Sequence, residues 1–271
     1  MEKNKQISWE EQRQIQLEVL KYVDSFCKAN AIQYSLAFGT LIGAVRHKGY
    51  IPWDDDIDII MTRNNYEKFR KIYKSPSYPL IDLKTDVNYP LSMGKIYDNR
   101  TYYYRRGVKR NLGLFIDVFP LDNVPEDIHT RQEWVKEIRE LNRLNIDKNT
   151  PVKYLFQSDS NFLGIIKKLL VKVFYSSSSI HQKMEKLYVK YNAEETKYVG
   201  VPAVMSMKKQ FCERVFPKEL FSDYTTLIFE NHQFSAISRY DEFLKIFYGD
   251  YMQLPPVEQR VGKHDIKAYY K

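Results

Sequence analysis

The spacing of apolar residues in the first half of the chain predicts alternating helices and strands. Ser8–Glu11 has the pattern of a capping box and is followed by apolar residues at helical spacing, so a helix is predicted to run to about Lys28. Shorter helices are predicted at 40–46 and after Thr62, which can cap the second of them. Strands are predicted at 32–38, 54–61, 80–83, 92–97, 101–104 and 114–119.

The second half of the chain has mainly helical spacing. Helices are predicted between about 126 and 192, including one at 162–175 that ends at four consecutive serines. A strand at 227–229, a turn at 231–232 and a helix at 240–247 complete the predicted elements. Strands followed by a block of helices indicate an α+β core with a helical addition.

Aspartate occupies four of the five positions from 54 to 58, directly before an apolar run. On a strand, Asp54, Asp56 and Asp58 share one face, with successive members roughly 6.5 Å apart. Like charges this close are costly unless a cation neutralises them, and carboxylate oxygens suit Mg²⁺ or Mn²⁺. The apolar neighbours favour a metal site over the alternative, a solvated acidic loop.

Asp117 is the one acidic residue in the apolar stretch 114–119. A buried carboxylate needs a partner, and a metal ion shared with Asp56 and Asp58 would supply one. The alternatives are an aspartate that caps a turn and an edge-strand aspartate that faces water.

Gly39 and Thr40 lie between a predicted strand and a predicted helix, just before the acidic stretch. Backbone N–H groups at the start of a helix can bind a phosphate, and a threonine hydroxyl can add a hydrogen bond. The pair is therefore a candidate phosphate site, with an ordinary turn as the alternative.

A longer signature surrounds these residues. The stretch 36–59 reads LAFGTLIGAVRHKGYIPWDDDIDI, 116–122 reads IDVFPLD, and 248–252 reads YGDYM. With these stretches, which together with their surroundings cover roughly half the chain, the sequence resembles the LicD family. That family includes bacterial phosphocholine transferases of teichoic acid or lipopolysaccharide and is related to fukutin-related proteins. Residues 126–220 have no recognised counterpart.

The resemblance implies a nucleotidyltransferase-like α+β fold, with a mixed sheet flanked by helices. The catalytic core would comprise 1–125, and a helical insertion would occupy 126–220. The segment 221–271 would return to complete the core and the active site.

The resemblance also implies roles for individual residues. The metal ligands would be Asp54, Asp56, Asp58 and Asp117. The catalytic residues would be Asp56, Asp58, Asp117 and His47. The predicted donor- and phosphate-binding residues are Gly39, Thr40, Arg46, Lys48, Arg260 and His264, of which Arg46 and Lys48 are chosen for their position just before the acidic stretch. The alternatives are a solvated basic loop for Lys48 and a surface histidine for His264. The remaining histidines, which belong to no such group, are assigned structural roles: His129, His181 and His232.

The reaction implied by the family is a metal-dependent transfer from a nucleotide-activated donor, typically phosphocholine from CDP-choline. The acceptor would be a hydroxyl of a lipid-linked glycan precursor such as teichoic acid, lipopolysaccharide or a capsule repeat. Mg²⁺ or Mn²⁺ would hold the diphosphate while the hydroxyl attacks in line. One alternative is a nucleotidylyltransferase that attacks the α-phosphate of a nucleoside triphosphate. A second is a non-catalytic glycan-binding or membrane-associated module.

Composition narrows the partners and the compartment. The formal net charge of +8 favours an anionic partner, but there is no concentrated basic stripe or nucleic-acid motif, so no nucleic-acid partner is expected. Cys27 and Cys212 form no C-x-x-C pair, which fits a reducing compartment. No signal peptide or spanning segment is recognised, so the predicted location is the cytoplasm.

The stretch 162–175 is apolar but carries Lys167, Lys168 and Lys172. It is too short to span a bilayer. The favoured interpretation is a core helix with one solvated edge. The alternative is a helix that lies on the inner face of the plasma membrane as a peripheral contact.

Overall fold

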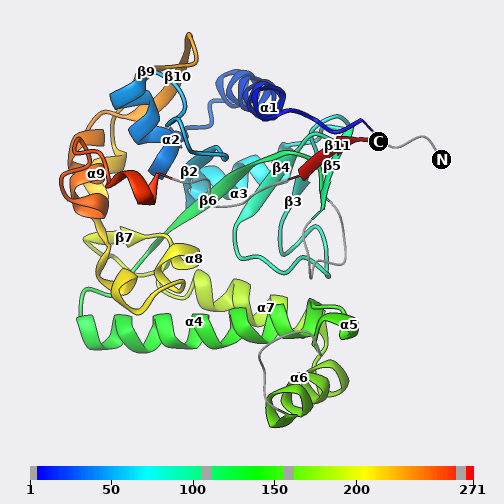
Figure 1. The fold of residues 1–271 in the computed structure, drawn as a ribbon. Coiled ribbons are helices and arrows are strands. Elements are labelled where there is room, and N and C mark those ends of the chain that lie inside the picture. Colours follow the sequence, from blue (N-terminus) through cyan, green and yellow to red (C-terminus); the bar gives the residue numbers. More distant parts are fainter. Residues whose placement is uncertain (1–4, 105–111, 156–161, 261–266) are drawn as a thin grey trace.

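The computed structural model describes residues 5–104, 112–155, 162–260 and 267–271 (Figure 1). A sheet crosses the centre of the molecule. Helix α1 (Trp9–Ala29) lies on one side of it, and the long helices α4 (Ile128–Asn149) and α7 (Ser177–Tyr188) run together on the other. The expected α+β class is confirmed.

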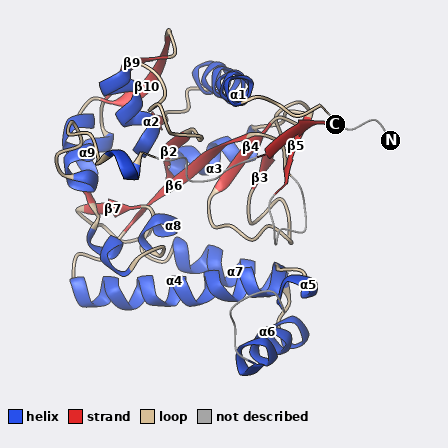
Figure 2. Ribbon diagram, in the orientation of Figure 1, coloured by secondary structure: helices blue, strands red, loops and turns tan. Residues whose placement is uncertain are grey.

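The central sheet has the strand order β1-β2-β6-β4-β3, and β7 and β8 extend it from the end of β6 (Figure 2). The strands are β1 (Ser35–Leu36), β2 (Asp58–Thr62), β3 (Leu80–Ile81), β4 (Gly94–Tyr97), β6 (Phe115–Asn123), β7 (Tyr198–Gly200) and β8 (Phe216–Pro217). β2 and β6 are parallel, whereas the other pairs are antiparallel, so the sheet is mixed as expected.

Two hairpin-like pairs lie outside this sheet. They are formed by β5 (Thr101–Tyr104) with β11 (Lys267–Tyr270) and by β9 (Tyr224–Phe229) with β10 (His232–Ile237). The turn of the second pair falls at Glu230 and Asn231, both with positive φ, one residue earlier than predicted. The pairing of β11 with β5 therefore places C-terminal residues beside the N-terminal half of the chain.

The remaining helical elements are short, apart from α3, α6 and α9. They are α2 (Phe38–Ile42), a π-helical turn (Gly43–His47), α3 (Arg63–Ile72), α5 (Val152–Leu155), α6 (Phe162–Phe174), α8 (Pro202–Met205), α9 (Tyr240–Tyr248) and 3-10 turns at Lys209–Glu213, Lys218–Phe221 and Val257–Gln259. The predicted helical character of 126–192 is confirmed, while the domain boundaries at 125 and 220 stay predictions.

The predicted strand at 54–61 is wrong in its first half, because β2 begins only at Asp58. The Ile57 carbonyl oxygen already accepts the N–H of Asp117 on β6, but the carbonyl groups of the preceding acidic residues bond to side chains of α1. The Arg13 guanidinium donates to the carbonyl oxygens of Ile51, Pro52 and Asp54, at 2.7–3.0 Å. These bonds hold the acidic segment as an irregular loop.

The boundary predicted at Gly39 and Thr40 is also shifted. The first strand ends at Leu36, and α2 already begins at Phe38, so the pair lies inside a helix. The side chain of Phe38 packs against Phe119 of β6 and Phe247 of α9, which anchors this helix to the core.

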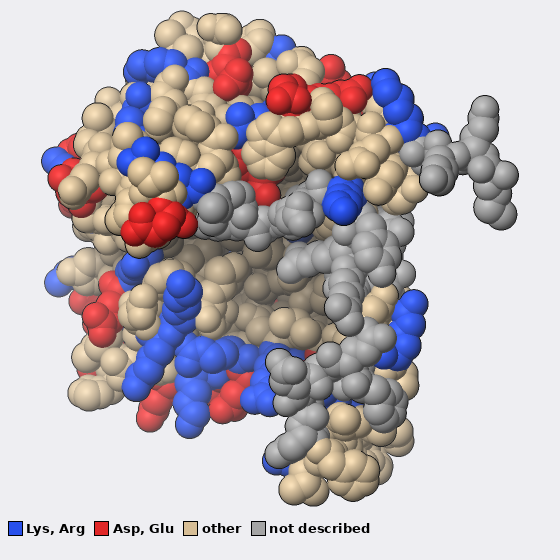
Figure 3. Space-filling view, in the orientation of Figure 1, with Lys and Arg blue, Asp and Glu red and all other residues tan. Residues whose placement is uncertain are grey.

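The second apolar cluster of the molecule joins α4 and α7 to the sheet. Trp134 and Ile138 of α4 and Met184 of α7 are buried together with Leu114 and Phe115 at the start of β6. His181 is buried there and contacts Leu83 and Asn145, so its predicted structural role is confirmed. The space-filling view shows a hollowed face between the core and these helices, with Lys and Arg side chains along its lower rim (Figure 3).

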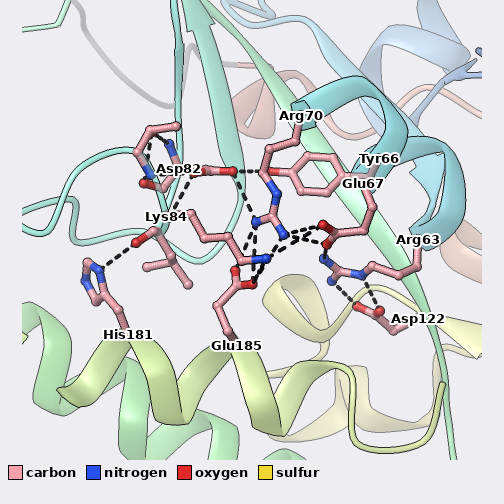
Figure 4. Close-up of polar contacts among 11 residues, drawn as sticks. Arg63, Tyr66, Glu67, Arg70, Asp82, Lys84, Asp122, His181 and Glu185 are labelled. Atoms are coloured by element: carbon pink, nitrogen blue, oxygen red, sulfur yellow. Dashed lines mark hydrogen bonds and ion pairs between the residues drawn. The ribbon is translucent and has the colours of Figure 1, made fainter. Parts of the chain in front are cut away.

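An ion-pair network joins α3 to the sheet and to α7 (Figure 4). Arg63 makes two hydrogen bonds, of 2.7 and 2.6 Å, to the fully buried carboxylate of Asp122. Arg70 lies between Glu67, Asp82 of the loop after β3, and Glu185 of α7. The network therefore fixes α7 relative to α3 and the sheet.

Replacing Arg63 with alanine should lower the free energy of unfolding by about 3 kcal/mol, because it leaves the Asp122 carboxylate buried without its cation. The matched control is Arg239→Ala, whose partner Glu242 is exposed, so its loss should be much smaller than that of Arg63→Ala. Urea denaturation of both variants measures the difference. Equal losses of unfolding free energy in the two variants would contradict the larger contribution expected of the buried pair.

Candidate active site

Three aspartates meet at the start of the two parallel strands. Asp58 of β2 and Asp117 of β6 are direct neighbours in the register, and Asp56 precedes β2 by two residues. One carboxylate oxygen from each lies within 4.8 Å of the others. Asp54, Asp55 and Asp56 form a second group that satisfies the same criterion and shares Asp56. The sequence-predicted convergence of Asp54, Asp56, Asp58 and Asp117 is therefore reproduced by two linked groups.

The electrostatics of the cluster favour a bound cation. Burial, reinforced by the charges of Asp54 and Asp117, raises the pKa of Asp56 to about 8. Burial and the neighbouring carboxylates also raise the pKa of Asp58 well above its usual value. The carboxyl groups of Asp56 and Asp58 therefore lie close to other carboxylates, whose negative charge the protein only partly compensates.

Lys95 of β4 is the residue of this site that the sequence patterns did not reveal. It stands opposite Asp117 in the sheet register, forms a short ion pair with the Asp117 carboxylate, and is only 3% exposed. Its ammonium nitrogen also lies 3.3 Å from the centroid of the Phe115 ring. The available signal was a single lysine within an otherwise apolar strand, which predicts a buried partner of opposite charge.

Gly39 and Thr40 position the acidic segment. The Thr40 hydroxyl, which is buried, accepts a 2.8 Å hydrogen bond from the backbone N–H of Asp58. A Cβ atom at Gly39 would lie 2.4 Å from the Asp54 carboxylate, so only glycine allows this approach. Gln16 of α1 adds a hydrogen bond to the carbonyl oxygen of Asp55. Phosphate binding by Gly39 and Thr40 stays a prediction.

A pocket of about 630 Å³ contains two of the predicted donor-binding residues, Arg46 and Arg260, on its wall. Arg46 is anchored by a 2.6 Å hydrogen bond to the carbonyl oxygen of Tyr251. Burial, and next the charge of Arg260, lowers the pKa of Arg46. Two guanidinium groups that repel each other at one pocket favour an anionic ligand.

Aromatic side chains connect this pocket to the acidic cluster. Trp53, the residue before Asp54, lines the pocket and lies 5.6 Å from the Arg260 guanidinium, measured to the ring centroid. Tyr248 of α9 lines it as well. Although 42% of Tyr248 is exposed, burial around its phenol group and then the charges of Asp58, Asp54 and Asp56 raise the pKa of that phenol, which places it within their electrostatic field. Tyr248 lies in a motif that the sequence singled out without a role.

The remaining predicted site residues are His47, Lys48 and His264. His47 accepts a 3.0 Å hydrogen bond from Arg46, and burial followed by the Arg46 charge lowers the pKa of His47, which favours its neutral form. Lys48 is exposed, does not line the pocket, and its carbonyl oxygen accepts the N–H of Glu230. His264 lies outside the described residues.

Comparison with known proteins gives consistent matches. Residues 31–158 match the family described as LicD/FKTN/FKRP, nucleotidyltransferase domain. A lipopolysaccharide cholinephosphotransferase, LicD of Haemophilus influenzae, is 32% identical over 271 residues, which is 98% of this chain and 99% of that protein. An uncharacterised protein of Rickettsia typhi is 40% identical over 55 residues, which is 20% of this chain and 18% of that protein. An uncharacterised protein of Rickettsia prowazekii is 48% identical over 42 residues, which is 16% of each chain.

In the metal-free protein, stability should fall as the pH rises from about 4 to about 8. The native state keeps a proton on Asp56 over this range, whereas the unfolded chain has released it, so raising the pH favours unfolding. The expected loss is on the order of 5 kcal/mol, because the pKa of Asp56 differs by about four units between the two states, and urea denaturation in the presence of a chelator measures it.

Asp56→Asn should reduce this pH dependence, leaving the part due to Asp58, and make the protein more stable than the wild type at pH 8. Asp223→Asn, which replaces an exposed aspartate outside the cluster, is the control and should keep the wild-type profile. A wild-type stability that rises or stays constant across this window would refute the expected linkage.

Proposed function

The chain belongs to the LicD family and is a phosphotransferase, and we propose that it transfers phosphocholine from CDP-choline onto a hydroxyl of a cell-surface glycan precursor. The observation that carries this proposal is the cluster of Asp56, Asp58 and Asp117 beside a pocket lined by two arginines. The similarity to a lipopolysaccharide cholinephosphotransferase over nearly the whole of both chains supports the transferred group and the class of acceptor.

The carboxylate cluster fits one or two Mg²⁺ or Mn²⁺ ions, with Asp56, Asp58 and Asp117 as ligands and Asp54 beside them. Its donor set consists of hard oxygen atoms, which both ions prefer. The raised pKa values of Asp56 and Asp58 indicate more negative charge than Lys95 neutralises. Such an ion, when bound, supplies charge neutralisation for the donor diphosphate.

We assign the pocket to the donor nucleotide. Arg46 and Arg260 bind its phosphate oxygens, for which the planar guanidinium group provides paired N–H donors. The rings of Trp53 and Tyr248 supply flat surfaces against which a base can stack. This arrangement orients the diphosphate toward the aspartates, which lie next to Trp53 in the sequence and near Tyr248 in space.

The remaining chemistry consists of positioning and proton transfer. The acceptor hydroxyl attacks phosphorus in line, the new P–O bond forms, and the bond to the leaving cytidine monophosphate breaks. Asp117, held in place by its ion pair with Lys95, orients the attacking hydroxyl and accepts its proton. Lys95 thereby acts as a positioning residue.

Thermal denaturation with Mn²⁺ should reveal the donor. We expect CDP-choline to raise the melting temperature in a metal-dependent way, because it binds only the folded form. CDP-glycerol, CDP-ribitol, UDP-sugars and nucleoside triphosphates serve as comparisons. Asp56→Asn/Asp58→Asn should abolish the shift, and Asp223→Asn should keep it.

Product analysis then separates the two reaction classes. Release of cytidine monophosphate with a loss of about 1,000-fold or more in kcat for the Asp56→Asn variant is the expected result. Release of pyrophosphate from a nucleoside triphosphate would instead establish a nucleotidylyltransferase and overturn the proposal. Full transferase activity of Asp56→Asn/Asp58→Asn would show that the acidic cluster has no role in catalysis.

Arg46→Ala should raise the KM for the donor by roughly 10- to 100-fold, with a smaller effect on kcat, because it removes a phosphate contact formed before the chemical step. Arg46→Lys, which keeps the charge but loses the planar donor pair, should restore part of the affinity. Lys71→Ala is the control, since Lys71 is an exposed lysine of α3 that does not line the pocket, and it should leave KM within about twofold of the wild type. An unchanged KM in folded Arg46→Ala would exclude this donor site.

A further inference from the structure

Helix α6 turns its apolar side away from the protein, so the predicted core helix at 162–175 is wrong. None of its residues is buried. Phe162, Val173 and Phe174 are 76%, 75% and 75% exposed, and Leu163 and Leu170 are exposed as well. These five residues fall on one side of the helix, because their positions follow helical spacing. They are called the α6 face below. In Figure 3 the surface at the position of α6 carries few charged side chains.

The polar side of α6 faces the protein instead of solvent. The Lys172 ammonium group donates hydrogen bonds to the carbonyl oxygens of Lys148 and Thr150 at the end of α4, and Lys148 donates to the carbonyl oxygen of Lys172. Burial raises the pKa of Asp147, and the charge of Lys168 opposes that rise, so Lys168 also lies toward α4. The orientation of α6 is therefore set by polar contacts that keep the α6 face outward.

We propose that the α6 face is a membrane-docking surface that lies in the interface of an anionic lipid bilayer. An amphipathic helix with aromatic residues at its ends and lysines at its border binds such an interface through apolar burial and charge attraction. Phe162 and Phe174 stand at the two ends, and Lys167 is exposed on the same helix. Membrane binding by the α6 face does not depend on which acceptor the enzyme uses.

Charge favours lipid over a second copy of the chain. Residues 151–175 contain four lysines and one aspartate, so two copies joined through this region would repel each other. The same excess of positive charge is attracted to anionic head groups. Since α6 has 13 residues, its length is about 20 Å, which suits a helix lying in the plane of the interface. Among the described residues, no helix meets the length and hydrophobicity that a membrane span requires.

Vesicle co-sedimentation tests this surface. The full-length protein is mixed with vesicles of pure phosphatidylcholine, or of equal parts phosphatidylcholine and phosphatidylglycerol. Binding should be stronger to the anionic vesicles. Val173→Ser/Phe174→Ser should weaken it at least about tenfold, because two exposed apolar side chains no longer enter the interface. Lys167→Glu should weaken binding to anionic vesicles alone.

The controls remove comparable groups elsewhere. Met207→Ser/Ile228→Ser deletes two exposed apolar side chains outside α6, and Lys71→Glu reverses an exposed charge on α3. Both should bind vesicles like the wild type, and all variants should share its melting temperature. Wild-type protein that ignores anionic vesicles, or an α6-face variant that binds them normally, would refute the proposal. A wild-type dimer that becomes monomeric in Val173→Ser/Phe174→Ser would assign the face to self-association instead.

Discussion

Mutual repulsion among the aspartates at the start of β2 and β6 is the constraint around which the catalytic half is arranged. Asp56, Asp58 and Asp117 can approach one another only because surrounding groups hold them there. Lys95 pairs with Asp117 from the adjacent strand, and the Thr40 hydroxyl accepts the N–H of Asp58. Stability is thus spent on holding like charges together, and the same charges make the site suited to a divalent cation.

Elements far apart in the sequence contribute to this arrangement. Helix α1 reaches the acidic loop through Arg13 and Gln16, which bond to its carbonyl oxygens. Helix α9, near the other end of the chain, brings Tyr248 into the electrostatic field of the aspartates and lines the donor pocket. The family signature near the N-terminus and the tail motif therefore meet at one site, which explains why both are present in the same chain.

Helices α4 and α7 are attached to the rest of the molecule by two kinds of interaction. Apolar side chains such as Trp134 and Met184 pack beside the start of β6, and the ion pair of Arg70 with Glu185 joins α3 to α7. In α6 the pattern is reversed, because Lys172 bonds to the end of α4 whereas the α6 face points outward. The aspartate cluster and the proposed membrane-docking surface thus lie in different parts of the molecule.

The sequence alone determined the α+β class, most of the helices and the identity of the clustered aspartates, because these depend on local spacing and on charge density within a few residues. It did not reveal that Asp54 and Asp56 lie in a loop, since that loop is stabilised by Arg13 and Gln16 from a distant helix. Lys95 acquired its role only when β4 aligned it with Asp117. The outward face of α6 was likewise decided by tertiary structure, because periodicity shows that a helix has two sides but not which of them meets the protein.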